Sequence, residues 1–273
     1  MRIDVDSVLR ERAPRHYRYI PGWAVKWLED VICQDRLNML LEHNAASSGT
    51  DFARGVLKDL SISYTLAGNV PDGKNRRVII VSNHPLGGLD GMALACIAED
   101  IYGRQADVKF VVNDLLNFVE PLRPIFLGVN KHGAQSRTSV EKIDRAFESD
   151  SPILMFPAGM VSRRGKDGVV ADLPWHKMSV VKAILSHRDI IPVHFSGENS
   201  QFFYKFARLR SRLGIKFNIE MVRLPKEIFL SEGSHFTVTF GAPVAWQSLE
   251  GGRNAQQQAD RLRSIVYQLP CQK

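Results

Sequence analysis

The chain has 273 residues, of which 44% are apolar and 24% are charged, and its formal net charge at pH 7 is +7. This is an ordinary soluble globular composition, and the length suits one large domain or one domain with a small N-terminal appendage. The positive charge favours acidic partners, such as an anionic lipid surface or an acidic carrier protein. The basic residues are spread along the chain, a distribution that does not favour nucleic-acid binding.

The cysteines and the hydropathy pattern argue against a secreted or membrane-spanning protein. Cys33, Cys96 and Cys271 lack CxxC spacing and a His-rich companion, which is typical of reduced thiols in the cytosol. The first residues lack the apolar core of a signal peptide, and no stretch reaches the ~18 apolar residues of a membrane span. We therefore expect a cytoplasmic protein that meets lipid, if at all, peripherally at the inner face of the cell membrane.

Residues 1–67 are predicted to form an N-terminal helical segment. Met1–Arg18 is highly charged and is expected to fray. From Pro21 to Leu41 apolar residues recur near helical spacing, and the stretch includes Trp23 and Trp27 beside Lys26. This pattern fits core-packing helices, a membrane-interface anchor, or both on opposite faces of one helix. A further helix is predicted over Gly49–Leu66.

Residues 68–273 are predicted to form an α/β domain, because strand and helix patterns alternate along them. Strands are expected at Val78–Val81, Val108–Val112, Ile125–Val129, Pro152–Phe156, Ile190–Phe195 and His235–Phe240. Helices are expected at Gly91–Tyr102, Thr138–Phe147, Met178–Ser186, Ser200–Leu213 and Asn254–Leu269. The fold class is thus a mostly parallel mixed sheet flanked by helices. The Ser200–Leu213 helix is basic and aromatic. This pattern is typical of a helix that lies on an anionic lipid surface, or of a core helix whose basic face is exposed to solvent.

The stretch Arg77–Asp90, RVIIVSNHPLGGLD, carries the strongest functional signal. An apolar strand runs into a polar corner, and a helix pattern follows. The carboxyl ends of parallel strands open onto the crevice where α/β proteins place their chemistry. His84 is therefore a candidate proton acceptor, with Asp90 as the carboxylate that orients it. The alternatives are a helix cap for Asp90 and a loop histidine for His84.

Four segments, which follow the family's order along the chain, carry a resemblance to a known family. NHPLGGLD at Asn83–Asp90 and FPAGMVS at Phe156–Ser162 resemble the two main blocks of the glycerolipid acyltransferases. LGVNKHG at Leu127–Gly133 lies where that family has a basic residue, and Ile191-Pro192-Val193 resembles its late strand. The end of the domain is similar over Leu224–Val244. The run Asp172-Leu173-Pro174-Trp175 adds to this resemblance. Within the family, the chain resembles most closely the hemolysin-like branch, which includes aminolipid O-acyltransferases.

The resemblance implies an acyltransferase. A fatty acyl group would move from an acyl-carrier-protein or coenzyme A thioester to the hydroxyl of a lyso-lipid, either a lysophospholipid or a lyso-aminolipid. His84 and Asp90 would act as a general-base pair, without a covalent intermediate, a cofactor or a metal. N-acylation of an amine and a catalytically silent lipid- or carrier-binding module remain as alternatives. The implied substrate-binding residues are Asn83, Gly87, Gly88, Lys131, Phe156, Pro157, Gly159, Arg163 and Arg164.

The chain departs from the family pattern at two places. Five residues, not four, separate His84 from Asp90; we expect Gly87-Gly88 to absorb the extra residue in a loop, with Asp90 in the first helical turn. Ala158 stands where the phosphate-acceptor enzymes have a Glu, and the nearby arginines are displaced. Because a bidentate Arg clamp is the strongest way to hold a phosphate monoester, this departure favours a lyso-aminolipid or another hydroxylated lipid as the acceptor.

Overall fold

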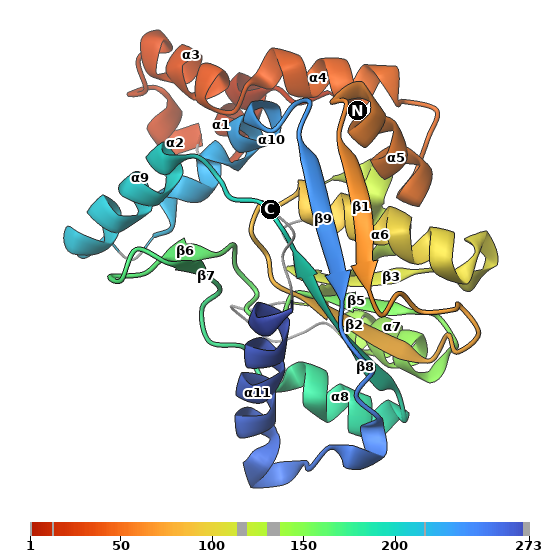
Figure 1. The fold of residues 1–273 in the computed structure, drawn as a ribbon. Coiled ribbons are helices and arrows are strands. Elements are labelled where there is room, and N and C mark those ends of the chain that lie inside the picture. Colours follow the sequence, from red (N-terminus) through yellow and green to blue (C-terminus); the bar gives the residue numbers. More distant parts are fainter. Residues whose placement is uncertain (1, 13, 114–118, 130–136, 216, 270–273) are drawn as a thin grey trace.

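The computed structural model describes residues 2–12, 14–113, 119–129, 137–215 and 217–269. The strands of its main sheet are β1 (Ser63–Gly68), β2 (Val78–Ser82), β3 (Lys109–Asn113), β4 (Phe126–Val129), β5 (Ile153–Met155), β8 (Asp189–Phe195) and β9 (His235–Phe240). Their order is β1-β9-β8-β2-β5-β3-β4, and β8–β9 is the antiparallel pair among these strands (Figure 1). The predicted mostly parallel mixed sheet is confirmed.

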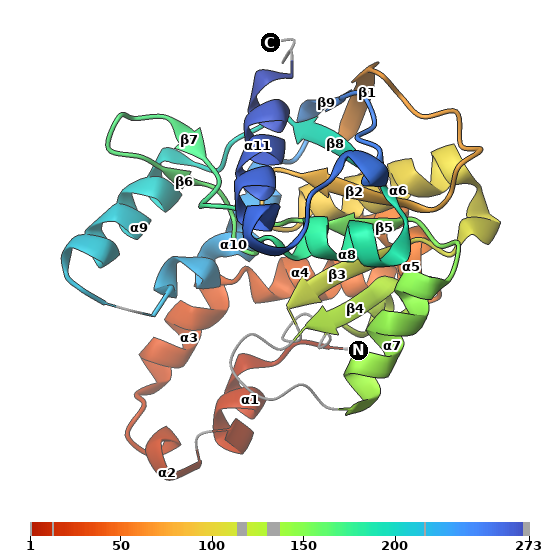
Figure 2. The same cartoon turned by 90° about the horizontal axis from the view of Figure 1, so that it is seen from below.

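Helices cover both faces of the sheet, as Figures 1 and 2 show. They are α1 (Val5–Arg12), α2 (Pro14–Tyr17), α3 (Gly22–Val31), α4 (Gln34–His43), α5 (Gly49–Asp59), α6 (Leu89–Tyr102), α7 (Arg137–Glu148), α8 (Met178–Ser186), α9 (Gln201–Arg212), α10 (Leu224–Leu230) and α11 (Ala255–Gln268). The short strands β6 (Arg163–Arg164) and β7 (Val170–Ala171) pair as a separate antiparallel hairpin.

Strand β2 lies at the centre of the sheet, and its side chains enter two cores in alternation. Val78 and Ile80 pack in the core that includes α5 and α6, whereas Ile79 and Val81 pack in the core with α7, α8 and α11. A strand that is buried on both faces has apolar residues at successive positions, which explains the apolar run Val78–Val81 in β2. The carboxyl end of β2 is thereby fixed between both layers, and the candidate site begins there.

The helix predicted over Gly49–Leu66 is wrong beyond Asp59. The chain turns at Ser61, whose φ is +53°, and Ile62 donates its N–H back to the carbonyl of Leu57 to close the helix. Residues 63–68 then form β1, which pairs in parallel with β9 along the whole of both strands. This partner lies some 170 residues away along the chain, so no local pattern indicated it. Strand β1 spans the boundary at residue 68 between the two predicted regions.

The described part of the N-terminal segment forms α1 and α2, and side chains of α4 contact it. The side chain of Asn38 on α4 pairs with the main chain of Ile3 in both directions, at 2.7 and 2.8 Å, and Gln34 accepts from the N–H of Val5. These bonds satisfy main-chain groups at the start of α1 and tie it to α4. Among the described helices, none is both long and apolar enough to cross a membrane.

Candidate active site

The loop between β2 and α6 brings His84 and Asp90 into contact. The His84 Nδ1 atom lies 2.9 Å from Asp90 Oδ2, and Asp90 lies in the first turn of α6, as predicted. Gly87 makes the five-residue connection fit: its φ is +81°, and a Cβ atom there would lie 2.8 Å from Val161. The extra residue relative to the family pattern is therefore taken up by the loop and does not separate the pair.

Asp90 is fully buried and accepts several hydrogen bonds besides the one from His84. The main-chain N–H of Leu86 donates to Oδ2 and that of Gly91 to Oδ1, both at 2.9 Å. Burial alone would raise the pKa of Asp90, but the charge and hydrogen bond of His84 and these N–H groups outweigh it and lower the pKa. An ionised carboxylate only accepts, so Nδ1 of His84 carries a proton, and in the neutral form of the imidazole Nε2 then keeps its lone pair.

The His84 ring is held on one face and stays partly exposed. Phe156, at the end of β5, stacks on the ring with 3.9 Å between centroids, and Phe110 packs edge-on against Phe156. The His84 side chain remains 15% exposed. Pro157–Gly159 forms a turn, in which the Gly159 N–H donates to the Phe156 carbonyl. The blocks Asn83–Asp90 and Phe156–Ser162, far apart in sequence, thus meet at one site.

The structure places other predicted substrate-binding residues in structural contacts. Asn83 is buried, and its side chain pairs with both main-chain groups of Phe195, which ties the ends of β2 and β8 together. Arg163 donates to the fully buried Glu220 at 2.9 Å and to the carbonyl of Val161. Gly88 lies at the start of α6 and faces Ile228.

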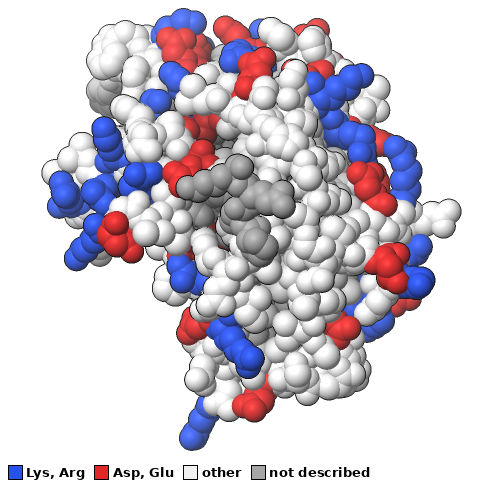
Figure 3. Space-filling view, viewed as in Figure 1, with Lys and Arg blue, Asp and Glu red and all other residues white. Residues whose placement is uncertain are grey.

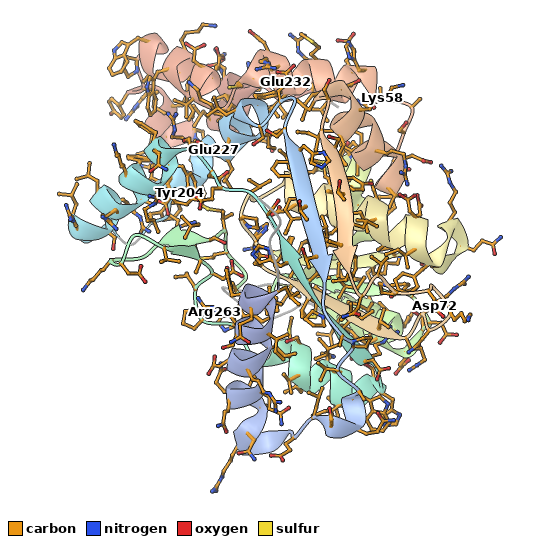
Figure 4. All side chains as sticks on the ribbon, in the orientation of Figure 1. Lys58, Asp72, Tyr204, Glu227, Glu232 and Arg263 are labelled. Carbon is orange, nitrogen blue, oxygen red and sulfur yellow. The ribbon has the colours of Figure 1, made fainter. Side chains whose placement is uncertain are left out.

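Arg164, the next residue on β6, is more accessible than Arg163. It pairs with Glu198 at 3.2 Å, and its guanidinium lies over the ring of Tyr204, which Figure 4 labels. Glu198 is itself half exposed, so an anionic ligand can compete with it for Arg164. Lys131, the remaining predicted residue, lies outside the described residues. In the part of the chain that the structure describes, no three His, Cys, Asp or Glu side chains form a metal-binding group.

Sequence reasoning missed buried side chains that hold the loop between β2 and α6. Asn199 donates to the main-chain carbonyl of Pro85 at 3.0 Å. The carboxylate of Asp172 accepts a hydrogen bond from the main-chain N–H of His84 at 3.1 Å. The resemblance included Asp172 in a run of four residues, but nothing in the sequence linked it to His84, which lies 88 positions earlier.

Several known proteins are similar to this chain over most of its length. A family model described as "Acyltransferase" matches residues 7–272. A lyso-glycine lipid O-acyltransferase of Bacteroides thetaiotaomicron is 41% identical over 271 residues, covering 98% of this chain and 97% of the relative. An enzyme of the same name from Phocaeicola vulgatus is 39% identical over 269 residues, covering 98% and 95%. Among solved structures, the 1-acyl-sn-glycerophosphate acyltransferase PlsC of Thermotoga maritima aligns with a TM-score of 0.45 and 16% identity, over 79% of each chain.

Proposed function

This chain belongs to the acyltransferase family, and from that premise we propose that it esterifies the free hydroxyl of a lyso-lipid with a fatty acyl group. The acyl donor is the thioester of an acyl carrier protein or of coenzyme A. The observation that carries the proposal is the 2.9 Å contact between a part-exposed imidazole and a buried carboxylate. Supporting it, two relatives that align over nearly the whole chain are named for O-acyl transfer.

The proposed reaction is a direct attack. The acceptor hydroxyl gives its proton to Nε2 of His84 as its oxygen bonds to the thioester carbonyl carbon. The tetrahedral intermediate then collapses, the carbon–sulfur bond breaks, and the imidazolium returns the proton to the departing thiolate. Asp90 holds the ring in the required tautomer and stabilises the imidazolium. No acyl group needs to rest on the enzyme.

We infer a lyso-aminolipid as the acceptor, in preference to a phosphate-bearing one. Ala158 is buried and carries no charge, and Arg163 already pairs with Glu220, so the described residues here offer no free bidentate clamp for a phosphate. The printed name of both relatives, lyso-glycine lipid O-acyltransferase, supports the same class. The accessible Arg164 is the residue we propose for the acceptor's head group.

Acceptor competition tests the proposed function. We expect the pure protein, given an acyl-carrier or acyl-CoA thioester, to esterify a lyso-glycine lipid at least ~10-fold faster than lysophosphatidate, a difference of about 1.4 kcal/mol. The matched control acceptor is the same lyso-glycine lipid without its hydroxyl, which should give no product. An amide formed from an amine acceptor would instead support N-acylation. A protein that binds lipid but consumes no thioester would be a silent binding module.

We also propose that the protein approaches its lipid at an anionic membrane surface through α3 and α9, which lie at the same end of the molecule (Figures 1 and 2). On α3, Trp23 and Trp27 are 75% and 60% exposed, while Val25 on the opposite side of the helix is buried. On α9, exposed Phe202 lies on a helix with a basic outer face, and Figure 3 shows Lys and Arg side chains gathered there. Exposed tryptophans beside basic residues are typical of interfacial helices.

Replacing both tryptophans of α3 tests this surface. We expect Trp23→Ser/Trp27→Ser to weaken binding to vesicles containing anionic lipid by roughly 10-fold or more, because each exposed ring loses its apolar contact with the bilayer. Co-sedimentation with vesicles measures the loss. The matched control is Leu185→Ser on α8, which removes an equally exposed apolar side chain from another part of the surface. Equal binding by the double variant and the wild type would refute the α3 anchor.

A further inference from the structure

Both main-chain polar groups of His84 are held by the segment that contains the β6–β7 hairpin. The N–H of His84 donates to Asp172 Oδ1 at 3.1 Å, and its carbonyl accepts from the N–H of Ser162 at 2.8 Å. Neither contact involves the imidazole ring. The ring is oriented by Asp90 and Phe156, whereas the backbone that carries it is fixed by residues from a different part of the chain.

The Asp172 carboxylate is the centre of this attachment. It is only 4% exposed, yet both of its oxygens are engaged. Oδ1 accepts from His84 N–H and from the Ser162 hydroxyl, the latter at 2.6 Å, and Oδ2 accepts from the indole N–H of Trp175 at 2.9 Å. Hydrogen bonds to an ionised acceptor are roughly twice as strong as neutral ones, so this carboxylate holds the loop firmly.

Asp172 is in turn fixed by helix α11. Its own N–H donates to the hydroxyl of Tyr267 at 2.7 Å, and its carbonyl accepts from Arg263 at 2.6 Å (Arg263 is labelled in Figure 4). Gln256, also on α11, donates to the carbonyl of Trp175. A helix near the end of the described chain thus supports the loop that carries His84 through one buried side chain.

We infer that Asp172 is a positioning residue for the acyl transfer, acting through the main chain of His84. The inference rests on the proposed function. The loop from Asn83 to Gly88 contains no regular structure. Phe195 holds Asn83 and Asn199 holds the Pro85 carbonyl, but the N–H of His84 itself needs a further fixed point to keep Nε2 within reach of the acceptor hydroxyl. Asp172 supplies that point without touching the ring, and its burial keeps it away from substrate.

The test is the Asp172→Asn variant. One amide oxygen cannot replace two carboxylate oxygens: if it faces His84, the amide NH₂ opposes the Trp175 N–H, and if it faces Trp175, the His84 N–H loses its acceptor. We expect kcat to fall roughly 10- to 100-fold, because displacement of a reacting group by about 1 Å has an effect of that order. The KM for the lyso-lipid should change by less than about twofold, since Asp172 contributes no uniform substrate binding.

A spectroscopic readout separates positioning from general stability. In protein labelled only at its histidine main-chain nitrogens, the His84 amide proton should move upfield in Asp172→Asn as its charged acceptor is lost. The matched control is Val180→Ala, a fully buried α8 residue in the same core as Trp175. That variant should lower the melting temperature while keeping kcat within twofold and leaving the His84 amide resonance in place.

Three results would overturn the inference. They are a kcat of Asp172→Asn within twofold of the wild-type value, an unchanged chemical shift of the His84 amide proton in that variant, and an equal loss of kcat in Val180→Ala. If Asp172→Asn does not fold, the Ser162→Ala variant tests the same inference. It removes one of the three side-chain hydrogen bonds of Asp172 and should lower kcat about threefold or more with KM unchanged. An unchanged kcat in Ser162→Ala would count against positioning. A wild-type protein with no transferase activity would refute the proposed function itself.

Discussion

His84→Ala is expected to lower turnover by roughly 10³-fold or more at saturating thioester and lyso-lipid, because a general base contributes ~10²–10⁴ and the ring also orders the loop. The loss should appear in kcat. The measurement is product formation followed by mass spectrometry at equal protein concentration. It is accompanied by the melting temperature, since removal of the imidazole leaves the buried Asp90 carboxylate without its partner.

The matched variant His84→Asn separates chemistry from folding. An Asn amide at this position can still donate to Asp90 from nearly the place of Nδ1, but it has no atom equivalent to the basic Nε2. We expect a melting temperature near that of the wild type and a turnover as low as in His84→Ala. Substantial activity in His84→Asn would mean that His84 contributes structure and not proton transfer.

Asp90→Asn is expected to have the second largest effect, a fall in kcat of roughly 10²- to 10⁴-fold. The amide can donate to Nδ1 and so favour the tautomer whose proton sits on Nε2, where the base is needed; the same substitution in a Ser-His-Asp triad costs about 10⁴-fold. Initial rates with saturating substrates measure the loss. The control is the KM for the thioester, which should stay within about twofold because Asp90 is fully buried. Turnover within threefold of wild type would contradict a role for the carboxylate.

The lowered pKa of Asp90 gives this prediction a pH signature. Because the pKa is lower in the folded than in the unfolded protein, the ionised carboxylate stabilises the fold above the ordinary carboxyl pKa. That stabilisation is lost as pH falls through the folded value. Chemical denaturation of wild type and Asp90→Asn between pH 7 and pH 3 should show a difference in unfolding free energy that shrinks on the acid side. A constant difference would contradict the assigned pKa direction.

Much of the central fold follows from local sequence pattern. Strand β2 is a run of four apolar residues because both faces are buried, and α6 begins where the Gly pair ends the loop. The contact between His84 and Asp90 was predictable for the same reason, since strand, loop and helix are adjacent in sequence and glycine permits the positive φ that Gly87 adopts. Only the family resemblance, however, linked this corner to the segment Phe156–Ser162.

The features that escaped prediction depend on distant partners. Strand β1 follows a helix pattern and is held by β9, and the charged N-terminal segment is held by two side chains of α4. The roles of Asn83 and Arg163 could not be foreseen either. Their polar side chains resemble ligand-binding groups in sequence. In the structure, Asn83 bonds to Phe195 and Arg163 to Glu220, and both partners lie more than fifty residues away along the chain. Asp172 was missed because its contact with His84 is through a main-chain N–H, which leaves no residue-type signature.

The measurement that tests the central claim most directly is the mass of the lipid formed from an acyl thioester and a lyso-glycine lipid whose free hydroxyl carries a heavy oxygen isotope. We predict a product that is heavier than the acceptor by one acyl group, that retains the labelled oxygen in the new ester, and that forms with wild-type protein but not with His84→Asn. Thioester hydrolysis without a lipid product, an amide in place of an ester, or equal product with His84→Asn would contradict the account.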